Sequence, residues 1–171
     1  RGRYPWSMRA APQPFRDLPA GTPARPLRVL VTGFEPFGGS PINPSAVLLE
    51  MLESAGARGC QLRTLLLPVV GGAGAGSARA ALDAALDALQ PDALVLFGEA
   101  HTRGAISIER VAVNLRDYRI ADNSGDVVQD TPVVAGAPDA LFAALPVRAM
   151  ADAVEAADVP VELSLSAGAF L

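Results

Sequence analysis

The stretch that decides the fold is LRVLVTGFEPFGGSPINPSAVLLEMLESA, residues 27–55. It opens with an apolar run that predicts a strand over Leu27–Thr32, and it closes with a run that predicts a helix over Pro44–Ala55. Asn43 can cap the free backbone N–H groups of this helix, and Pro44 suits the first helical position. The stretch is therefore the first half of a strand, helix, strand unit.

The same alternation of strands and helices continues along the rest of the sequence. Further strands are predicted over Gln61–Pro68, Ala93–Phe97, Ile106–Asn114 and Val161–Leu165, and further helices over Ser77–Leu89 and Pro146–Ala156. Within the fourth of the five strands the alternation slips at Glu109 and Arg110, where a bulge could re-aim the glutamate. The predicted fold class is α/β, with a mostly parallel sheet.

Residues 1–26 differ from the rest of the chain, because they are rich in proline and arginine and show no periodicity. We interpret them as an extended tail that precedes a domain over residues 27–171. For residues 1–7 two interpretations stay open, sequence left over from recombinant expression, which we favour, and an aromatic arm that docks on another subunit.

The composition excludes several classes of function. The net charge is −4 and every basic residue is arginine, so nucleic acid and anionic membranes are not expected as partners, and lysine chemistry is ruled out. No stretch approaches the roughly 20 apolar residues of a membrane helix. Cys60 and His101 are the only residues of their kinds, which excludes an internal disulfide and a zinc site built from Cys and His. We expect a cytoplasmic protein without a cofactor or metal.

The loop GFEPFGGSPINPS, residues 33–45, follows the first predicted strand, and ligands of α/β sheets bind at such carboxyl ends. Phe34 and Phe37 could form a small apolar pocket beside Asn43 and the first amides of the next helix. The alternative is that both phenylalanines plug the sheet and Asn43 only caps the helix. Composition alone favours neither.

Two other loops carry polar groups. Glu99, His101 and Arg103 follow the third strand, and for His101 we favour an exposed position. Glu109 suits a carboxylate that orients a catalytic histidine, with a surface pair to Arg110 as the alternative. The glycine run at residues 71–76 lies where a phosphate loop would lie, but it contains neither GxGxxG nor GxxxxGK[ST], so a flexible loop is the better interpretation.

In combination, these motifs resemble pyroglutamyl peptidase I, a family of cysteine peptidases. The resemblance is carried, from residue 27 to the end, by VTGFEPFGG, INPS, LLLPV, QPDALVLFGEA followed by Arg103, SIERVAVN, RIADNSG and SLSAGAFL. It implies a three-layer α/β/α sandwich. It also implies a reaction in which a cysteine thiolate removes the pyroglutamyl residue from the N-terminus of a peptide, with a histidine as base and acid and an acidic residue to orient the histidine.

The resemblance assigns roles to residues of this sequence. Glu109 matches the acid of the triad and Arg103 an active-site arginine. Phe34 and Phe37 match the aromatic walls around the lactam ring, and Asn43 a polar residue beside it. Glu99 stands where the family carries glutamine, and a glutamate that only accepts hydrogen bonds would bind the lactam N–H but repel its carbonyl oxygen.

The nucleophile of the family would follow Leu171 and the histidine would lie further on, so the sequence is expected to lack the C-terminal part of the domain. Cys60 enters the second strand and does not replace the nucleophile. A fragment of this kind would expose apolar sheet surface, which favours pairing into a homo-oligomer. The alternatives to the peptidase are an inactive lactam-binding module and, more weakly, a nucleotide- or phosphate-binding domain that rests on the glycine run.

Overall fold

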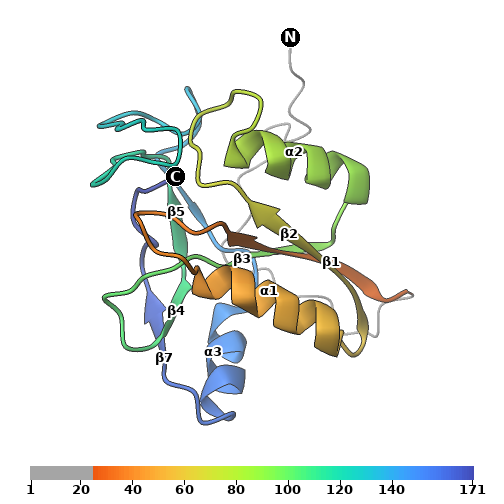
Figure 1. Cartoon of the computed structure of the whole chain (residues 1–171). Coiled ribbons are helices and arrows are strands. Elements are labelled where there is room, and N and C mark those ends of the chain that lie inside the picture. The colour runs from red at the N-terminus through yellow and green to blue at the C-terminus, as the bar shows by residue number, and fades with distance from the viewer. Residues whose placement is uncertain (1–24) are drawn as a thin grey trace.

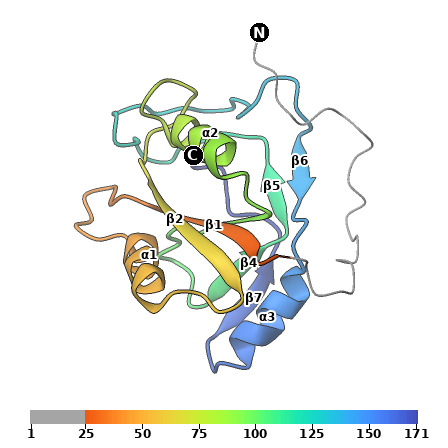
Figure 2. The ribbon, with the colours of Figure 1, turned by 90° about the vertical axis from the view of Figure 1, so that its right-hand side faces the viewer.

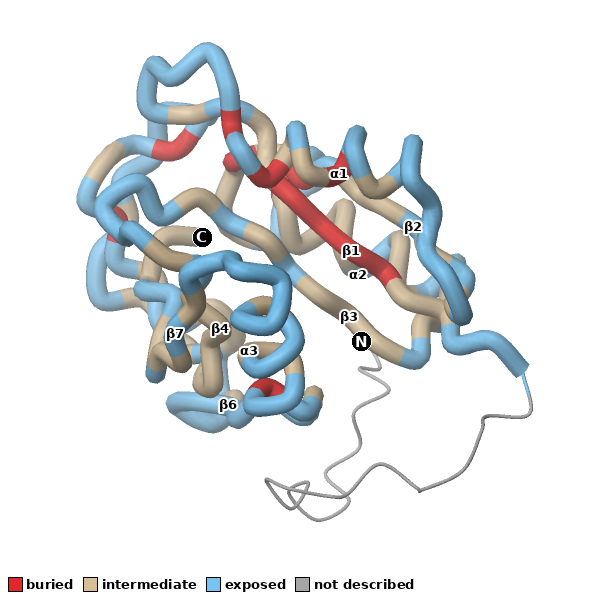
Figure 3. Tube along the Cα trace, turned by 90° about the horizontal axis from the view of Figure 1, so that it is seen from below, coloured by how far each residue is buried: buried red, intermediate tan, exposed pale blue. Residues whose placement is uncertain are grey.

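The core of the fold is a parallel sheet whose central strand is β1 (Leu27–Phe34). Strand β2 (Cys60–Leu67) pairs with one edge of β1 and strand β3 (Ala93–Leu96) with the other. In this computed structural model, which describes residues 25–171, the middle of β1 is the most deeply buried segment of the sheet (Figure 3). Because all three strands run the same way, the loops that follow them lie at one edge of the sheet.

Helices α1 (Pro44–Ala55) and α2 (Ala78–Leu89) lie on opposite faces of this sheet (Figure 1). Each begins at a side-chain cap. The Oδ1 atom of Asn43 accepts a hydrogen bond from the backbone N–H of Ser45 at 3.0 Å, and the Oγ atom of Ser77 accepts one from Ala80 at 3.2 Å. These two of the three predicted helices are confirmed, and α1 has the predicted bounds.

The second half of the domain contains two short strand pairs, β4 (Ile106–Glu109) with β7 (Val161–Ser164) and β5 (Val111–Val113) with β6 (Ala140–Phe142) (Figure 2). Strands β4 and β7 are parallel and pack against helix α3 (Val147–Glu155). Strands β5 and β6 are antiparallel. The arrangement agrees with the predicted α/β class and its mostly parallel sheet.

The prediction of one strand over Ile106–Asn114 is wrong, because the chain changes its pairing partner at Arg110. The N–H of Arg110 still bonds to Ser164 of β7 at 2.9 Å, but its carbonyl oxygen accepts from Ala143, next to β6, at 2.8 Å. The slip in the sequence pattern marks this exchange, and a break between two strands replaces the predicted bulge. Strand β6 was not predicted, since it is short and its residues are exposed.

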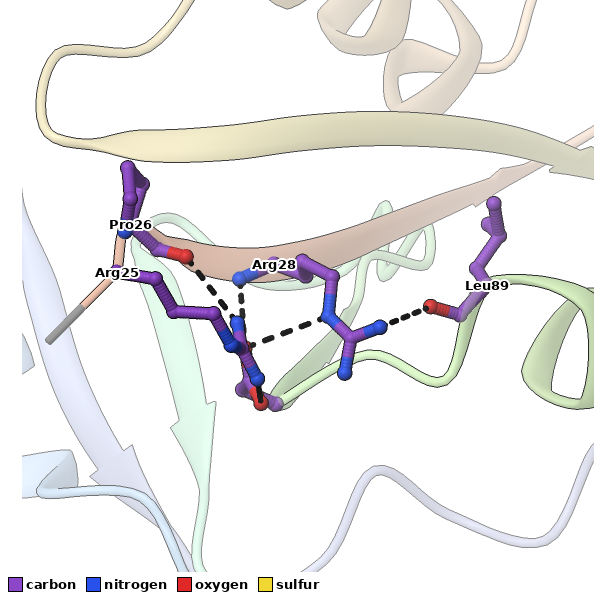
Figure 4. Close-up of polar contacts among 5 residues, drawn as sticks. Arg25, Pro26, Arg28 and Leu89 are labelled. Atoms are coloured by element: carbon purple, nitrogen blue, oxygen red, sulfur yellow. Dashed lines mark hydrogen bonds and ion pairs between the residues drawn. The ribbon is translucent and has the colours of Figure 1, made fainter. Parts of the chain in front are cut away.

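An arginine and aspartate cluster closes the amino end of the sheet (Figure 4). Both carboxylate oxygens of Asp92 accept from the Arg25 guanidinium at 2.7 Å, and one of them also accepts from the backbone N–H of Arg28 at 2.8 Å. The hydrogen bonds from Arg25 and Arg28 hold the pKa of the Asp92 carboxyl well below its usual range. Residues 1–24, most of the predicted tail, lie outside the described residues.

Several large apolar side chains are exposed. Leu96, Phe142 and Leu165 are 53%, 61% and 69% exposed. The expected pairing of copies through apolar surface stays a prediction. Among residues 25–171, no helix has the length and the apolar character needed to span a membrane.

Candidate active site

An arginine links the carboxyl ends of β4 and β7. The Nη1 atom of Arg103 lies 2.6 Å from Oε1 of Glu109, the last residue of β4. The Nη2 atom of the same guanidinium donates to the carbonyl oxygen of Ser166, just beyond β7, at 3.1 Å. The structure thus brings together two residues that the sequence predicted for the site.

The second carboxylate oxygen of Glu109 is the exception in this cluster. The Oε2 atom is buried, and no donor within residues 25–171 bonds to it. A buried carboxylate oxygen without a hydrogen bond is unfavourable and rare in native proteins. This oxygen is therefore an unsatisfied acceptor at the carboxyl end of β4.

Three aromatic rings contact one another, and we call them the aromatic wall. Phe37, from the loop after β1, stacks on Phe170 with ring centroids 5.5 Å apart and an interplanar angle of 29°. Tyr118 meets the edge of Phe170 at a centroid distance of 5.1 Å. Phe34, the other predicted pocket aromatic, is half-buried at the end of β1, and it is in none of the ring contacts found among residues 25–171.

Asn43 is only 1% exposed and holds the loop that carries Phe37. Its Oδ1 atom accepts from both the backbone N–H and the hydroxyl of Ser45, and its Nδ2 atom donates to the carbonyl oxygen of Glu35 at 3.0 Å. The Ser45 hydroxyl in turn accepts from the N–H of Phe34 at 2.9 Å. Asn43 therefore fixes both ends of the loop, and the expectation that it also contacts a lactam stays a prediction.

The loop after β3 contributes Glu99 and His101. Glu99 is half-buried, while His101 is exposed, as the sequence analysis favoured. The N–H of Arg103 bonds to the carbonyl oxygen of Ala100 at 2.9 Å, which closes the turn and brings the Arg103 side chain back toward β4. Cys60 is the first residue of β2 and lies at the opposite end of the strands.

The segment that joins these loops, residues 117–126, was not predicted from the sequence. The Asp122 carboxylate is 6% exposed and accepts from the backbone N–H groups of Gly71 at 2.8 Å, Ser124 at 2.9 Å and Asp126 at 3.1 Å. Burial alone would raise the pKa of Asp122, but these hydrogen bonds outweigh that effect and lower it below its usual value. The only signal was the motif RIADNSG, to which no role was assigned.

The same segment binds the other loops through its neighbouring residues. The Nδ2 atom of Asn123 donates to the carbonyl oxygen of Pro36 at 3.0 Å, and its backbone N–H donates to the carbonyl oxygen of Val69 at 2.7 Å. The N–H of Asp117 bonds to the carbonyl oxygen of Ala169 at 2.8 Å. The loops after β1 and β2 and the segment after β7 are thus all attached to residues 117–126. Within residues 25–171, no cluster of three or more His, Cys, Asp or Glu side chains could hold a metal ion.

Comparison with known proteins gives one consistent result. The family model described as pyroglutamyl peptidase matches residues 27–171. A pyrrolidone-carboxylate peptidase of Escherichia fergusonii is 43% identical over 143 residues, which are 84% of this chain and 65% of that protein. One of Gloeobacter violaceus is 47% identical over 145 residues, 85% of this chain and 69% of that protein. The chain thus spans about two thirds of the length of these curated relatives.

Solved structures agree with the sequence comparison. A crystal structure of pyroglutamyl peptidase I from Bacillus amyloliquefaciens has a TM-score of 0.78 at 33% identity, covering 84% of this chain and 68% of that one. A pyrrolidone carboxyl peptidase from Pyrococcus furiosus has the same TM-score at 41% identity, covering 84% and 67%. The predicted α/β sandwich is confirmed by these likenesses.

Proposed function

Because this chain belongs to the pyroglutamyl peptidase family, we propose that the whole protein is a cysteine peptidase that removes N-terminal pyroglutamyl residues from peptides. Residues 27–171 supply the lactam-binding loops and the acidic member of the triad. We assign the thiol and the imidazole to residues beyond Leu171, where the resemblance to the family places them. The cytoplasm keeps thiols reduced, which suits a thiol nucleophile, so we also propose that the protein acts there.

The free Oε2 atom of Glu109 is the observation that carries this proposal. Arg103 occupies the other carboxylate oxygen and keeps the group in place, while Oε2 is buried without a partner among residues 25–171. An imidazole N–H that bonds to Oε2 would satisfy this oxygen and would fix the orientation of the ring. This arrangement supports Glu109 as the orienting acid of a cysteine, histidine and glutamate triad.

The aromatic wall supports recognition of the lactam ring. A pyroglutamyl group has an apolar five-atom ring with one N–H donor and one C=O acceptor. Phe37, supported by Phe170, offers an apolar face for the ring, and Phe34 stands at the base of the same loop. We assign the lactam N–H to Glu99, which is half-buried and can only accept, and we assign Asn43 to the polar side of the pocket.

The chemistry then follows in two steps. The histidine takes the proton from the cysteine thiol, and the sulfur attacks the carbonyl carbon of the peptide bond that follows the pyroglutamyl ring. The peptide amine leaves with the proton that the histidine returns, and a thioester between the cysteine and pyroglutamate forms. Water, deprotonated by the same histidine, hydrolyses the thioester, which releases pyroglutamate and restores the thiol.

A fluorogenic amide of pyroglutamate, given to the full gene product, tests this proposal. We expect hydrolysis of this amide and none of the matching prolyl amide, whose ring lacks the lactam carbonyl. Glu109→Gln keeps the shape of the side chain and removes its charge, so kcat should fall by roughly 10²- to 10⁴-fold. Equal cleavage of both amides, or a Glu109→Gln variant with full activity, would contradict the proposal.

Glu99 favours a second candidate, a module that binds lactams without turnover. An ionised carboxylate beside the ring repels the lactam carbonyl oxygen, which a peptidase must hold in position. The expected signature is a rise in melting temperature with 2-pyrrolidone, together with no release of the fluorophore. Turnover by the full gene product excludes this second function.

A further inference from the structure

We propose that Asp122 is a positioning residue for the aromatic wall that binds the lactam ring. The proposal rests on the proposed function, and it concerns a residue whose carboxylate bonds to its own turn and to the loop after β2. Asp122 acts through a chain of contacts from its carboxylate to Gly71, and from Gly71 through the rings of Tyr118 and Phe170 to Phe37. Each contact in this series is present in the structure.

The two oxygens of Asp122 have different tasks. Oδ1 accepts from the backbone N–H and the hydroxyl of Ser124 and from the N–H of Asp126, all within its own turn. Oδ2 accepts from the N–H of Gly71, in the loop between β2 and α2, at 2.8 Å. One oxygen therefore builds the turn and the other attaches it to a loop that lies 51 positions earlier in the chain.

Gly71 in turn contacts the ring of Tyr118. A Cβ atom at Gly71 would lie 2.1 Å from the Tyr118 hydroxyl oxygen and 3.1 Å from its Cζ atom, so the tyrosine ring lies directly against the bare backbone. The hydroxyl of Tyr118 is buried and makes no hydrogen bond among residues 25–171, so packing holds this end of the side chain. The position of the Gly71 backbone thus sets the position of the ring.

Tyr118 in turn supports the other two rings of the aromatic wall. Its ring meets the edge of Phe170, and the opposite neighbour of Phe170 is Phe37 on the loop after β1. If the Gly71 loop moved away from Asp122, Tyr118 would lose its support, and both phenylalanines would shift. Binding of the lactam ring should then weaken, while the remaining contacts of Arg103 and Glu109 would stay unchanged.

The first test is Asp122→Asn in the full gene product. The amide oxygen is needed at the three donors of the turn, so the NH₂ group faces the Gly71 N–H and cannot accept from it. We expect the KM for the pyroglutamyl amide and the inhibition constant of 2-pyrrolidone to rise together, roughly tenfold, as one buried donor loses its partner. The rate at which iodoacetamide alkylates the nucleophile should change less than about twofold, because the thiol is not displaced.

Asp126→Asn is the matched control for charge. The Asp126 side chain is exposed and reaches only the Ser124 hydroxyl at 3.3 Å, so both constants should stay at their wild-type values. An Asp122→Asn variant with unchanged constants, or with a loss confined to kcat, would overturn the inference and leave the proposed function standing. A wild-type protein that neither cleaves the amide nor binds 2-pyrrolidone would remove both.

The second test leaves the Asp122 turn intact and changes the next contact. Gly71→Ala places a methyl group against the Tyr118 hydroxyl, and we expect the inhibition constant of 2-pyrrolidone to rise roughly tenfold. Tyr118→Phe removes the clashing oxygen, so the double variant should return to within about threefold of wild type. A double variant as weak as Gly71→Ala alone would show that Gly71 does not act through this ring, and the inference would fail.

Discussion

The ring of Phe37 stacks on the ring of Phe170, with 5.5 Å between the centroids and 29° between the planes. This contact joins the loop after the first strand to the segment after the last one. The cluster of Arg103 and Glu109 lies at the carboxyl ends of β4 and β7. The two stacked rings of the substrate wall are therefore supplied by opposite ends of the described chain, and the acidic group of the proposed reaction by Glu109 in its middle.

A double-mutant cycle of Phe37→Leu and Phe170→Leu should reveal this contact in the free energy of unfolding. We expect a coupling of about 0.5–1.5 kcal/mol, the usual value for an aromatic pair beyond its buried area. Urea unfolding of the four proteins measures it. Phe142→Leu is the control, because Phe142 is 61% exposed and its replacement should cost less than about 0.5 kcal/mol. Additive effects of the two wall variants would contradict the prediction.

Asn43→Ala should cost more stability than the removal of an ordinary helix cap. It deletes the cap of α1 and also the donor to the Glu35 carbonyl oxygen, so we expect a loss of about 2–3 kcal/mol and weaker binding of 2-pyrrolidone. Ser77→Ala deletes only the cap of α2 and should cost about 1 kcal/mol without an effect on binding. Equal losses in the two variants would show that the loop contact of Asn43 contributes nothing.

Arg103→Lys should lower kcat although it keeps the positive charge. A lysine ammonium cannot place two donors in the fixed geometry that reaches both Glu109 and Ser166. We expect kcat to fall roughly tenfold, the value of one hydrogen bond to a charged group, with a smaller change in KM. Steady-state kinetics measure the split. Arg148→Lys on the exposed side of α3 is the control, and an equal response of both variants would argue against the bridge.

Asp92 should make stability depend on pH in a defined window. Its pKa is lowered in the folded protein, so its contribution is complete above the unfolded value of about 3.9 and is lost as the pH falls from there through the folded value. Wild type should exceed Asp92→Asn in stability at pH 7, and the difference should shrink below about pH 4 and at high salt. Urea unfolding across pH checks this, with Asp87→Asn as the control. A difference that is constant with pH would refute it.

Local signals predicted the helices and the central strands well. Helix α1 has the predicted bounds because Asn43 and Pro44 define its start through short-range physics. The strand predicted over Ile106–Asn114 failed for the opposite reason. A change of pairing partner at Arg110 depends on β6 and β7, which come later in the chain, and sequence alternation reports a slip without saying what causes it.

The contacts that connect the parts of the candidate site could not be predicted from the sequence. Sequence motifs and the family resemblance selected Arg103 and Glu109, which the structure joins by a hydrogen bond, and Phe37, whose ring stacks on Phe170. Tyr118 and Asp122 were not selected, because their role lies in contacts with residues far away in the sequence, and a single tyrosine or aspartate in a polar stretch carries no local signal of such contacts.

The central place of β1 has a consequence for how the protein is made. This strand leaves the ribosome before either of its neighbours, yet both of its edges and its buried middle need β2 and β3 for pairing. Until β3 has emerged, the nascent chain carries an apolar strand with an open edge, which is the kind of surface that chaperones cover and that aggregates when left bare. Because β1 is translated first, it stays exposed for longer than any other strand of its sheet.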